Sequence, residues 1–399
     1  MRKKIDSRLL NRINNNTDKD ENVSIIILSK NIERLKRKKI LQACNCTIKY
    51  KLDIIDAVAV DIPASKIKML SQISEVNFIA DDSRVTTQME IVRGSVSCDA
   101  SEDLGFDGKG IGVAVLDTGV YPHEDLIAEG NRIVGFKDFV NNHDSAYDDN
   151  GHGTHVAGII AGDGYASKGK YKGIAPKSNI IGVKVMNKDG GGSTSDIVAG
   201  MQWVVNNKDK YNIKVMSLSL GSDPDLSESE DPLVRGVNAV WSKGIVVVTA
   251  AGNSGPDNST INSPGISNKV ITVGCSDSKG TIDTDDDTIA EFSSRGPTIS
   301  NKIKPDIVAP GVDVTSLKSN INYKPSDKSS VIKEKSYLPQ SGTSMSTPVV
   351  SGAIALLLQK DSSLTPDLIK RKLLKSTKNL KGSKYEQGRG LINIKELLS

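Results

Sequence analysis

Apolar and polar positions follow different patterns in the two parts of the chain. Residues 23–80 contain short apolar runs that predict strands and helices in the order β-α-β-β-α-β, which is typical of the split βαβ (ferredoxin-like) arrangement. The predicted strands are Val23–Leu28, Cys46–Ile54, Ala57–Ile62 and Val76–Ala80, and the predicted helices are Ile32–Cys44 and Ala64–Ile73. A domain of about 60 residues is marginal alone, so we expect it to rest on a partner surface.

The flanking segments are more polar. Residues 1–22 are interpreted as a flexible N-terminal extension, although Ile5, Leu9 and Ile13 stand at the spacing of a short amphipathic helix. Residues 81–105 contain few long apolar runs and are interpreted as a linker.

Residues 106–399 alternate near-continuous apolar runs with helical segments. This pattern predicts a parallel sheet covered by helices on both faces, which is a three-layer α/β domain. The predicted strands are Ile111–Leu116, Ile180–Val185, Val215–Leu220, Ile245–Thr249 and Val270–Val273, and the predicted helices include Ser195–Asn206, Pro232–Lys243 and Ser344–Gln359. Ligands of such sheets bind at the carboxyl ends of the strands. The Lys-, Ser- and Asn-rich stretch Lys318–Lys335 predicts a mobile loop.

Charge and cysteine content narrow the function classes. The net charge of +4 is too small to indicate nucleic-acid binding, and the basic run Arg34–Lys39 is better explained as a solvated helix face. No apolar stretch of the length of a signal-peptide core follows the basic start Met1-Arg-Lys-Lys, and no apolar stretch approaches the length of a membrane span. Cys44 and Cys46 are too close for an easy bridge, and the four cysteines lack zinc-ligand spacing. We therefore expect a reduced, cytoplasmic protein; non-classical release or a spore location stays open.

Three separated motifs carry candidate chemistry. Asp117 ends an apolar strand and precedes Thr-Gly, His152 begins His-Gly-Thr-His before a small-residue helix, and Ser344 opens an apolar helix within Gly-Thr-Ser-Met-Ser-Thr-Pro. A serine hydroxyl becomes a good nucleophile when an imidazole takes its proton and a carboxylate orients that imidazole. The order Asp, His, Ser along the chain is that of the subtilisin-type arrangement. The motifs therefore predict a serine peptidase.

Each motif residue also has a simpler interpretation. Asp117 alone reads as a strand-end turn residue, and Ser344 alone as a helix N-cap. Of the two histidines of the second motif, His152 faces the loop, whereas His155 lies one turn into the helix and is expected to be structural. A zinc interpretation of this pair lacks the glutamate and the third ligand of the zincin pattern.

Asn253 lies in Ala-Ala-Gly-Asn-Ser-Gly-Pro, directly after the strand Ile245–Thr249. Its side-chain amide and the Ser344 N–H are predicted to donate to a developing oxyanion. A turn asparagine is the simpler alternative.

Together these motifs resemble those of the subtilase family (peptidase family S8) over residues 108–399, and more narrowly an intracellular, AprX-like branch. The resemblance implies a catalytic triad of Asp117, His152 and Ser344, with Asn253 and Ser344 forming the oxyanion hole. It implies an extended substrate bound along Ser217, Leu218, Ser219, Leu220 and Gly221, with Ala250, Ala251 and Gly252 as the other wall of the S1 pocket. It also implies that residues 23–80 are an inhibitory propeptide that assists folding, removed by self-cleavage between Thr86 and Arg93.

Metal binding is left as unknown. The loop Gly162–Gly173 contains Lys168, Lys170 and Lys172, which oppose a cation, so calcium is not indicated at the usual subtilisin loop. The acidic clusters Asp144–Asp149 and Asp283–Asp287 could bind calcium, but solvated loops explain them more simply. The chemistry itself requires no cofactor.

The expected function is therefore a self-processing serine endopeptidase that acts on protein or peptide substrates, with apolar or aromatic P1 side chains. We expect no nucleic-acid or membrane partner. The alternatives are a narrow processing protease that activates one cellular or spore protein, a scaffold pseudoprotease, and a zymogen locked by its own prodomain.

Overall fold

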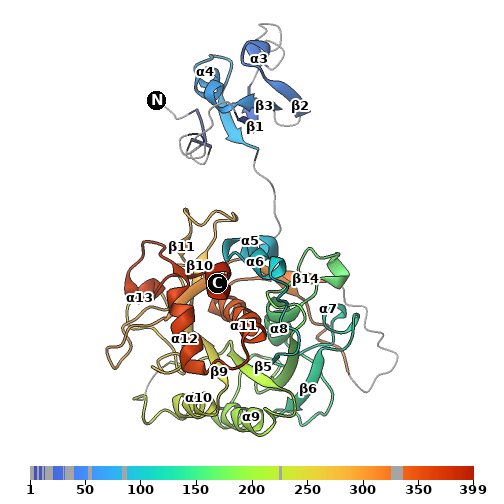
Figure 1. The fold of residues 1–399 in the computed structure, drawn as a ribbon, viewed down its shortest axis with the longest axis vertical. Helices are drawn as coiled ribbons and strands as arrows, with labels where there is room; N and C mark the ends of the chain where they lie inside the picture. Colours follow the sequence, from blue (N-terminus) through green and yellow to red (C-terminus); the bar gives the residue numbers. More distant parts are fainter. Residues whose placement is uncertain are drawn as a thin grey trace. The chain divides into compact units, whose positions relative to one another are not determined.

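The computed structural model describes residues 4–6, 9, 10, 13, 21–29, 31, 40–52, 56–82, 88–223, 227–324 and 336–399. The chain divides into two compact units, Met1–Val85 and Thr86–Ser399, which are described separately below (Figure 1).

The N-terminal unit is a four-stranded antiparallel sheet with the strand order β2-β3-β1-β4. Its elements are β1 (Asn22–Leu28), α3 (Ile40–Ala43), β2 (Thr47–Leu52), β3 (Ala57–Pro63), η2 (Ala64–Lys66), α4 (Ile67–Ser71) and β4 (Phe78–Asp81). Alternate residues of β1 are buried, as expected for a sheet with one covered face. Val23, Ile25 and Ile27 pack against Ile67 and Leu70 in one apolar cluster. The predicted ferredoxin-like order is confirmed, although residues 32–39 of the predicted first helix lie outside the described residues.

Part of the predicted N-terminal extension belongs to this unit. The Ile79 N–H donates to Lys4 O over 2.8 Å, and the Asp6 N–H donates to Ile79 O over 2.9 Å. Leu9 is fully buried in the same apolar cluster. The expectation of a flexible extension is therefore wrong for these described residues, because their apolar side chains complete the small core.

The prediction of a linker over residues 81–105 is also wrong for the part from residue 88 onward. The structure places α5 (Gln88–Ser95) and α6 (Asp99–Asp103) there. Met89, Val92 and Val96 are buried in the core of the C-terminal unit. These positions follow helical spacing, and their burial against the larger core stabilises a segment that its polar composition alone does not predict.

The C-terminal unit is built on a mainly parallel sheet with the strand order β15-β16-β12-β10-β9-β8-β5-β7-β6, and β11 pairs with β10. Antiparallel pairing is confined to β10–β11 and β15–β16 at this sheet, within the described residues. The strands are β5 (Gly112–Asp117), β6 (Ile133–Asp138), β7 (Asn179–Lys184), β8 (Ile213–Leu218), β9 (Val246–Ala250), β10 (Ile271–Asp277), β11 (Thr288–Ile289), β12 (Ile307–Pro310), β15 (Thr377–Lys378) and β16 (Leu391–Ile392). The strand order reverses beside β5, and such a switch point is where ligands bind at the carboxyl edge of an open α/β sheet.

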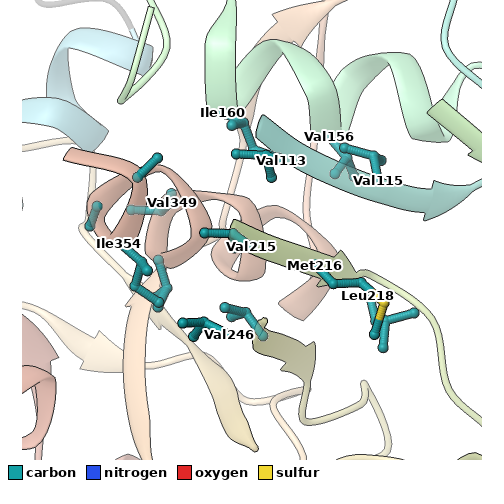
Figure 2. Packing of buried hydrophobic residues seen from close by; sticks show 14 of the residues in the cluster. Val113, Val115, Val156, Ile160, Val215, Met216, Leu218, Val246, Val349 and Ile354 are labelled. Carbon is teal, nitrogen blue, oxygen red and sulfur yellow. The ribbon is translucent and has the colours of Figure 1, made fainter. Parts of the chain in front are cut away.

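Helices cover both faces of this sheet. α8 (His152–Ala161) and α11 (Thr343–Lys360) pack against each other and on one face, and α9 (Thr194–Asn206) and α10 (Pro232–Ser242) pack on the other (Figure 1). Figure 2 shows Val156 and Ile160 of α8 beside Val113 and Val115 of β5 in the buried core. The predicted three-layer α/β architecture is confirmed.

Smaller elements complete the unit. They are α7 (Glu124–Ile127), η3 (Tyr165–Ser167), β13 (Val314–Leu317), β14 (Tyr337–Gln340), α12 (Pro366–Lys375), α13 (Lys384–Gln387) and α14 (Ile394–Leu398). Most of the predicted mobile loop, residues 325–335, lies outside the described residues. No helix in the described part of the chain combines the length and apolar content that a bilayer span requires.

Candidate active site

The carboxyl edge of the sheet brings the predicted Asp and His together. Asp117 is the last residue of β5 and is fully buried, and His152 is the first residue of α8. His152 Nδ1 lies 2.7 Å from Asp117 Oδ1, and the same oxygen accepts the Thr118 N–H over 2.8 Å. The carboxylate is therefore held by backbone and imidazole together, which fixes the orientation of the ring.

Gly153 allows this close approach of helix to strand. A Cβ added at Gly153 would lie 2.2 Å from Gly119 O and 3.0 Å from Asp117 Cβ. A larger residue would push the start of α8 away from the end of β5 and would separate His152 from its carboxylate.

The electrostatic environment favours the charged form of His152. Burial lowers the pKa of His152, but the negative charge and hydrogen bond of Asp117, with a further contribution from Asp148, outweigh it and leave the pKa above its usual value. The imidazole side chain remains 25% exposed, so a substrate can reach it.

His155 has a different environment. It is fully buried, and its Nε2 lies 3.0 Å from Val314 O and 3.1 Å from Leu338 O. Burial lowers the pKa of His155 to about 4, so the ring is neutral and joins β13 to β14. These contacts support the structural role expected for it.

Ser344 lies in the first turn of α11, beside a cavity of about 280 Å³. Its hydroxyl donates to Ser219 O over 3.1 Å, and the Ser219 hydroxyl donates to Ser344 O over 2.9 Å. The hydrogen bond that the structure gives Ser344 Oγ thus runs to the end of β8 rather than to His152. Catalytic hydrogen bonds of this kind often tighten only when substrate binds.

Asn253 is oriented by the residue before Ser344. Its Oδ1 accepts the Thr343 N–H and the Thr343 hydroxyl, both over 2.9 Å. A backbone N–H can only donate, so the oxygen of the amide must face Thr343 and Nδ2 must point the other way. Nδ2 and the Ser344 N–H are therefore two donors available beside this cavity.

The predicted substrate-binding residues separate into two groups. Ser219, Leu220, Gly221, Ala250 and Gly252 line the cavity beside Ser344. Ser217, Leu218 and Ala251 are fully buried and are not among the residues that line it. The strand β8 ends at Leu218, so its last residues face the core and only the segment after it reaches the cavity.

Sequence reasoning missed a polar network that holds the Asp and His motifs in place. Asp148 accepts the Thr118 hydroxyl over 2.9 Å, the Gly151 N–H over 2.8 Å and the Thr154 N–H over 2.9 Å. This one buried carboxylate therefore joins the residue after Asp117 to the first turn of α8. The sequence signal that could have indicated this role is the position of Asp148, four residues before His152.

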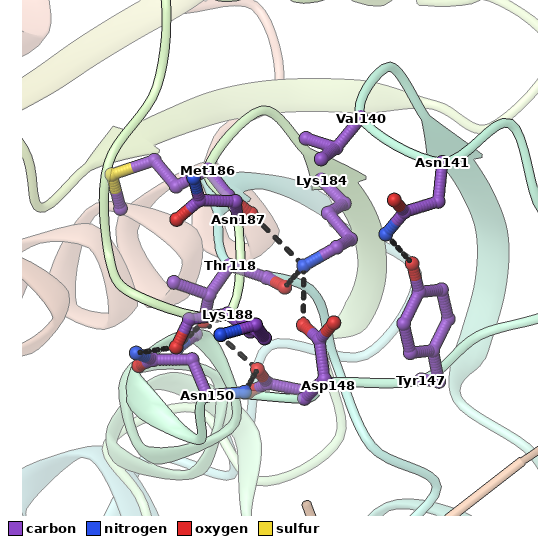
Figure 3. A network of polar contacts seen from close by, with 12 residues as sticks. Thr118, Val140, Asn141, Tyr147, Asp148, Asn150, Lys184, Met186, Asn187 and Lys188 are labelled. Atoms are coloured by element: carbon purple, nitrogen blue, oxygen red, sulfur yellow. Dashed lines mark hydrogen bonds and ion pairs between the residues drawn. The ribbon is translucent and has the colours of Figure 1, made fainter.

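Lys184, at the end of β7, is the second part of this network. It is fully buried, and Figure 3 shows its Nζ directed at the loop of the His motif. Nζ donates to Thr118 O and to Asp149 Oδ1, both over 2.6 Å, and to Met186 O over 2.9 Å. A buried ammonium is stable only with such partners.

Replacing Lys184 with methionine is expected to lower the free energy of unfolding by about 3–5 kcal/mol, because two buried carbonyls and Asp149 lose their partner. The measurement is urea unfolding in a Ser344→Ala background, followed by the fluorescence of Trp203 and Trp241. Both tryptophans lie in the C-terminal unit.

The matched control is Lys188→Met. Lys188 is paired with Asp189 over 2.9 Å, but both side chains are exposed, so a change below about 0.5 kcal/mol is expected. Equal changes in the two variants would contradict the structural role of Lys184.

The described residues contain no group of three His, Cys, Asp or Glu side chains placed to hold a metal ion. In the loop Gly162–Gly173, the Asp163 carboxylate lies 3.3 Å from the Arg132 guanidinium, and Lys172 pairs with Glu102 over 3.0 Å.

A three-layer α/β domain with a parallel sheet, an oriented Asp–His pair and a serine at the start of an adjacent helix defines the class of subtilisin-type serine peptidases. Comparison with known proteins agrees: the model of the subtilase family matches residues 108–390, and the chain belongs to this family. It is 54% identical over 275 residues to serine protease AprX of Bacillus subtilis (strain 168). The matched region covers 68% of this chain and 62% of AprX. The chain thus spans less than two thirds of that relative's length.

Two further similarities cover more of the matched proteins. The chain is 35% identical over 347 residues to an alkaline protease of Alkalihalobacillus alcalophilus, covering 86% of this chain and 80% of that protein. The solved structure of sphericase is 30% identical with a TM-score of 0.62, and the match covers 78% of this chain and 99% of sphericase. Both the fold and the family are therefore established.

Proposed function

We propose that this chain is a self-processing serine endopeptidase in which Ser344 is the nucleophile, His152 the general base and then acid, and Asp117 the residue that orients His152. The observation that carries this proposal is the 2.7 Å contact between His152 Nδ1 and Asp117 Oδ1. It lies at the edge of the sheet where α8 and α11 begin, and these two helices pack against each other.

The reaction begins when the Ser344 hydroxyl leaves Ser219 O and turns to Nε2 of His152. Ser344 Oγ then attacks the scissile carbonyl while His152 takes the hydroxyl proton. The Ser344 N–H and Asn253 Nδ2 stabilise the oxyanion of the tetrahedral intermediate. His152 returns the proton to the leaving amine, and a water molecule hydrolyses the acyl-enzyme by the same steps. Side chains and backbone supply each proton transfer and each oxyanion donor, so this reaction needs no cofactor.

The substrate is proposed to bind as an extended strand along the segment Ser219–Gly221, by addition of its backbone to that of the enzyme. The P1 side chain then enters the cavity between this segment and the wall Ala250–Gly252.

The N-terminal unit is proposed to act as an inhibitory propeptide. Self-cleavage is proposed between Thr86 and Arg93, at the N-terminal end of that range. Met89 and Val92 are buried in the core of the C-terminal unit, so a cut after Arg93 would remove both from the mature enzyme. Loss of two buried apolar side chains costs several kcal/mol.

The test is intact mass spectrometry of the purified chain before and after a serine-directed fluorophosphonate, together with hydrolysis of denatured casein. We expect the loss of the N-terminal unit, one covalent label on Ser344 and degradation of casein. A labelled enzyme that spares casein would favour the narrow processing protease. A full-length, unlabelled and inactive chain would contradict the proposal.

Replacing Asn253 with alanine is expected to lower kcat about 10²- to 10³-fold with little change in KM, the magnitude known for the loss of one such donor in a subtilisin. The measurement is steady-state hydrolysis of a chromogenic peptide. Asn253→Asp keeps an oxygen that accepts from Thr343 but lacks the amide donor, so it should lose at least as much activity. Retained activity in Asn253→Asp would show that Asn253 only anchors Thr343.

A further inference from the structure

Asn262 lies in the cavity beside Ser344, close to both of its walls. It lines that cavity together with the two proposed substrate walls. Its N–H donates to Ala251 O over 2.9 Å, which fixes its backbone to the wall that follows β9. The sequence alone indicates no role for Asn262, because a lone asparagine in a turn belongs to no recognisable motif.

The side chain of Asn262 lies between the two walls. A Cβ added at Gly252 would lie 2.7 Å from both Cγ and Oδ1 of Asn262, so only glycine fits there; its φ of +108° also favours glycine. On the other wall, a Cβ added at Gly221 would lie 3.1 Å from Asn262 Cβ and 3.7 Å from Nδ2. The side-chain amide of Asn262 therefore packs between the two glycines, with Oδ1 toward Gly252 and Nδ2 toward Gly221.

The two polar atoms of this amide differ in access. Oδ1 is buried without a hydrogen-bond partner in the described part of the chain, whereas the residue as a whole is half-buried. Nδ2 is not buried in this way and makes no hydrogen bond with the described residues. The polar atom that Asn262 presents to the cavity is thus an N–H donor.

The other lining side chains set the kind of ligand that this donor suits. Leu220 and Ala250 are the apolar side chains of the lining, and no charged side chain contributes to it. A carboxylate in this cavity would lose hydration without gaining a counter-charge. An uncharged acceptor would gain a hydrogen bond to Nδ2 at no such cost.

We infer that Asn262 is a specificity-determining residue that directs the peptidase toward substrates with glutamine or asparagine at P1. This inference rests on the proposed function, and it replaces the expectation of an apolar or aromatic P1. A site that hydrogen-bonds a substrate group discriminates against an analogue of the same shape that lacks it.

The chain itself contains a matching sequence. Gln88 is the one glutamine in the proposed self-cleavage range, and it lies directly before the buried Met89. Cleavage after Gln88 would leave the core of the C-terminal unit intact. We therefore expect the mature enzyme to begin at Met89.

The experiment uses the self-processed enzyme and two pairs of peptides of equal length, with Gln or Met at P1 and with Asn or Leu at P1. Wild type should prefer Gln to Met in kcat/KM. Asn262→Leu keeps the side-chain size without the donor, and the Gln-to-Met ratio should fall about tenfold, as for one neutral hydrogen bond. Asn262→Ala is a second variant should the leucine prevent folding. Asn258→Ala, an exposed asparagine of the same loop, is the matched control and should leave the ratio unchanged.

The outcomes separate this inference from the proposed function. If wild type and Asn262→Leu cleave with the same Gln-to-Met ratio, or if the mature chain begins after an apolar residue, Asn262 does not select P1. If wild type cleaves no peptide and takes up no fluorophosphonate, the peptidase proposal itself fails.

Discussion

Replacing Ser344 with alanine is expected to lower kcat roughly 10⁶-fold and to leave the chain full-length. This magnitude is that found for loss of the triad serine in a subtilisin. The variant should still fold, because among the described residues Ser344 Oγ makes one hydrogen bond, to Ser219 O, and a hydroxyl leaves no large cavity when removed. In the proposed mechanism the same hydroxyl serves self-cleavage and substrate cleavage, so we expect both to be lost together.

The measurement is intact mass after expression in a protease-deficient host, with tryptophan fluorescence as the check on folding. Ser341→Ala, three residues earlier, is the control. Ser341 Oγ bonds to Asp313 at an exposed position, so this variant should process and label as wild type does. Processing of Ser344→Ala at the same position would mean that another protease cuts the chain.

Trace wild-type enzyme added to Ser344→Ala separates two routes of maturation. If the mature N-terminus then appears, cleavage between molecules is possible and its rate depends on enzyme concentration. If it does not, the cut is made within one molecule.

The main strands of the sheet could be predicted because the strands of a covered parallel sheet are apolar on both faces. β5 and β7 therefore stand out as near-continuous apolar runs. The helix α5 could not be predicted in the same way, since Met89 and Val92 within it and Val96 just after it stand among polar and charged residues. Their helical spacing predicts a stable helix only if a larger core covers them, and the sequence does not show which surface that is.

The site, like the fold, has some features that the local sequence predicts and others that depend on the folded structure. The Asp117 and His152 motifs are local, because a strand end and a helix start each position one side chain, and the sequence predicts both. The cavity wall depends on where β8 ends, and the sequence alone does not show that Ser217 and Leu218, predicted to bind an extended substrate, are buried. Asn262 and Lys184 reach the site only through the fold, from segments that lack a motif.

Replacing Asp117 with asparagine is expected to lower kcat about 10⁴-fold near neutral pH, the cost known for the corresponding change in a serine protease triad. Asparagine is nearly the same size, so the strand end should keep its shape. The amide can donate to Nδ1 instead of accepting from it, which selects the wrong tautomer of His152 and leaves Nε2 unable to take the Ser344 proton.

The pH dependence gives an independent check on the same contact. His152 must be neutral to act as a base, so kcat/KM should rise with pH through the pKa of this residue. The charge and hydrogen bond of Asp117 raise the pKa of His152 in the free enzyme, so the wild-type midpoint should lie above about 6.5. Without that carboxylate the lowering effect of burial has less to oppose it, and the residual activity of Asp117→Asn should reach its plateau at lower pH. Asp189→Asn, which removes a charge at an exposed pair, should leave the midpoint in place. An unchanged midpoint in Asp117→Asn would mean that the titrating group is not His152.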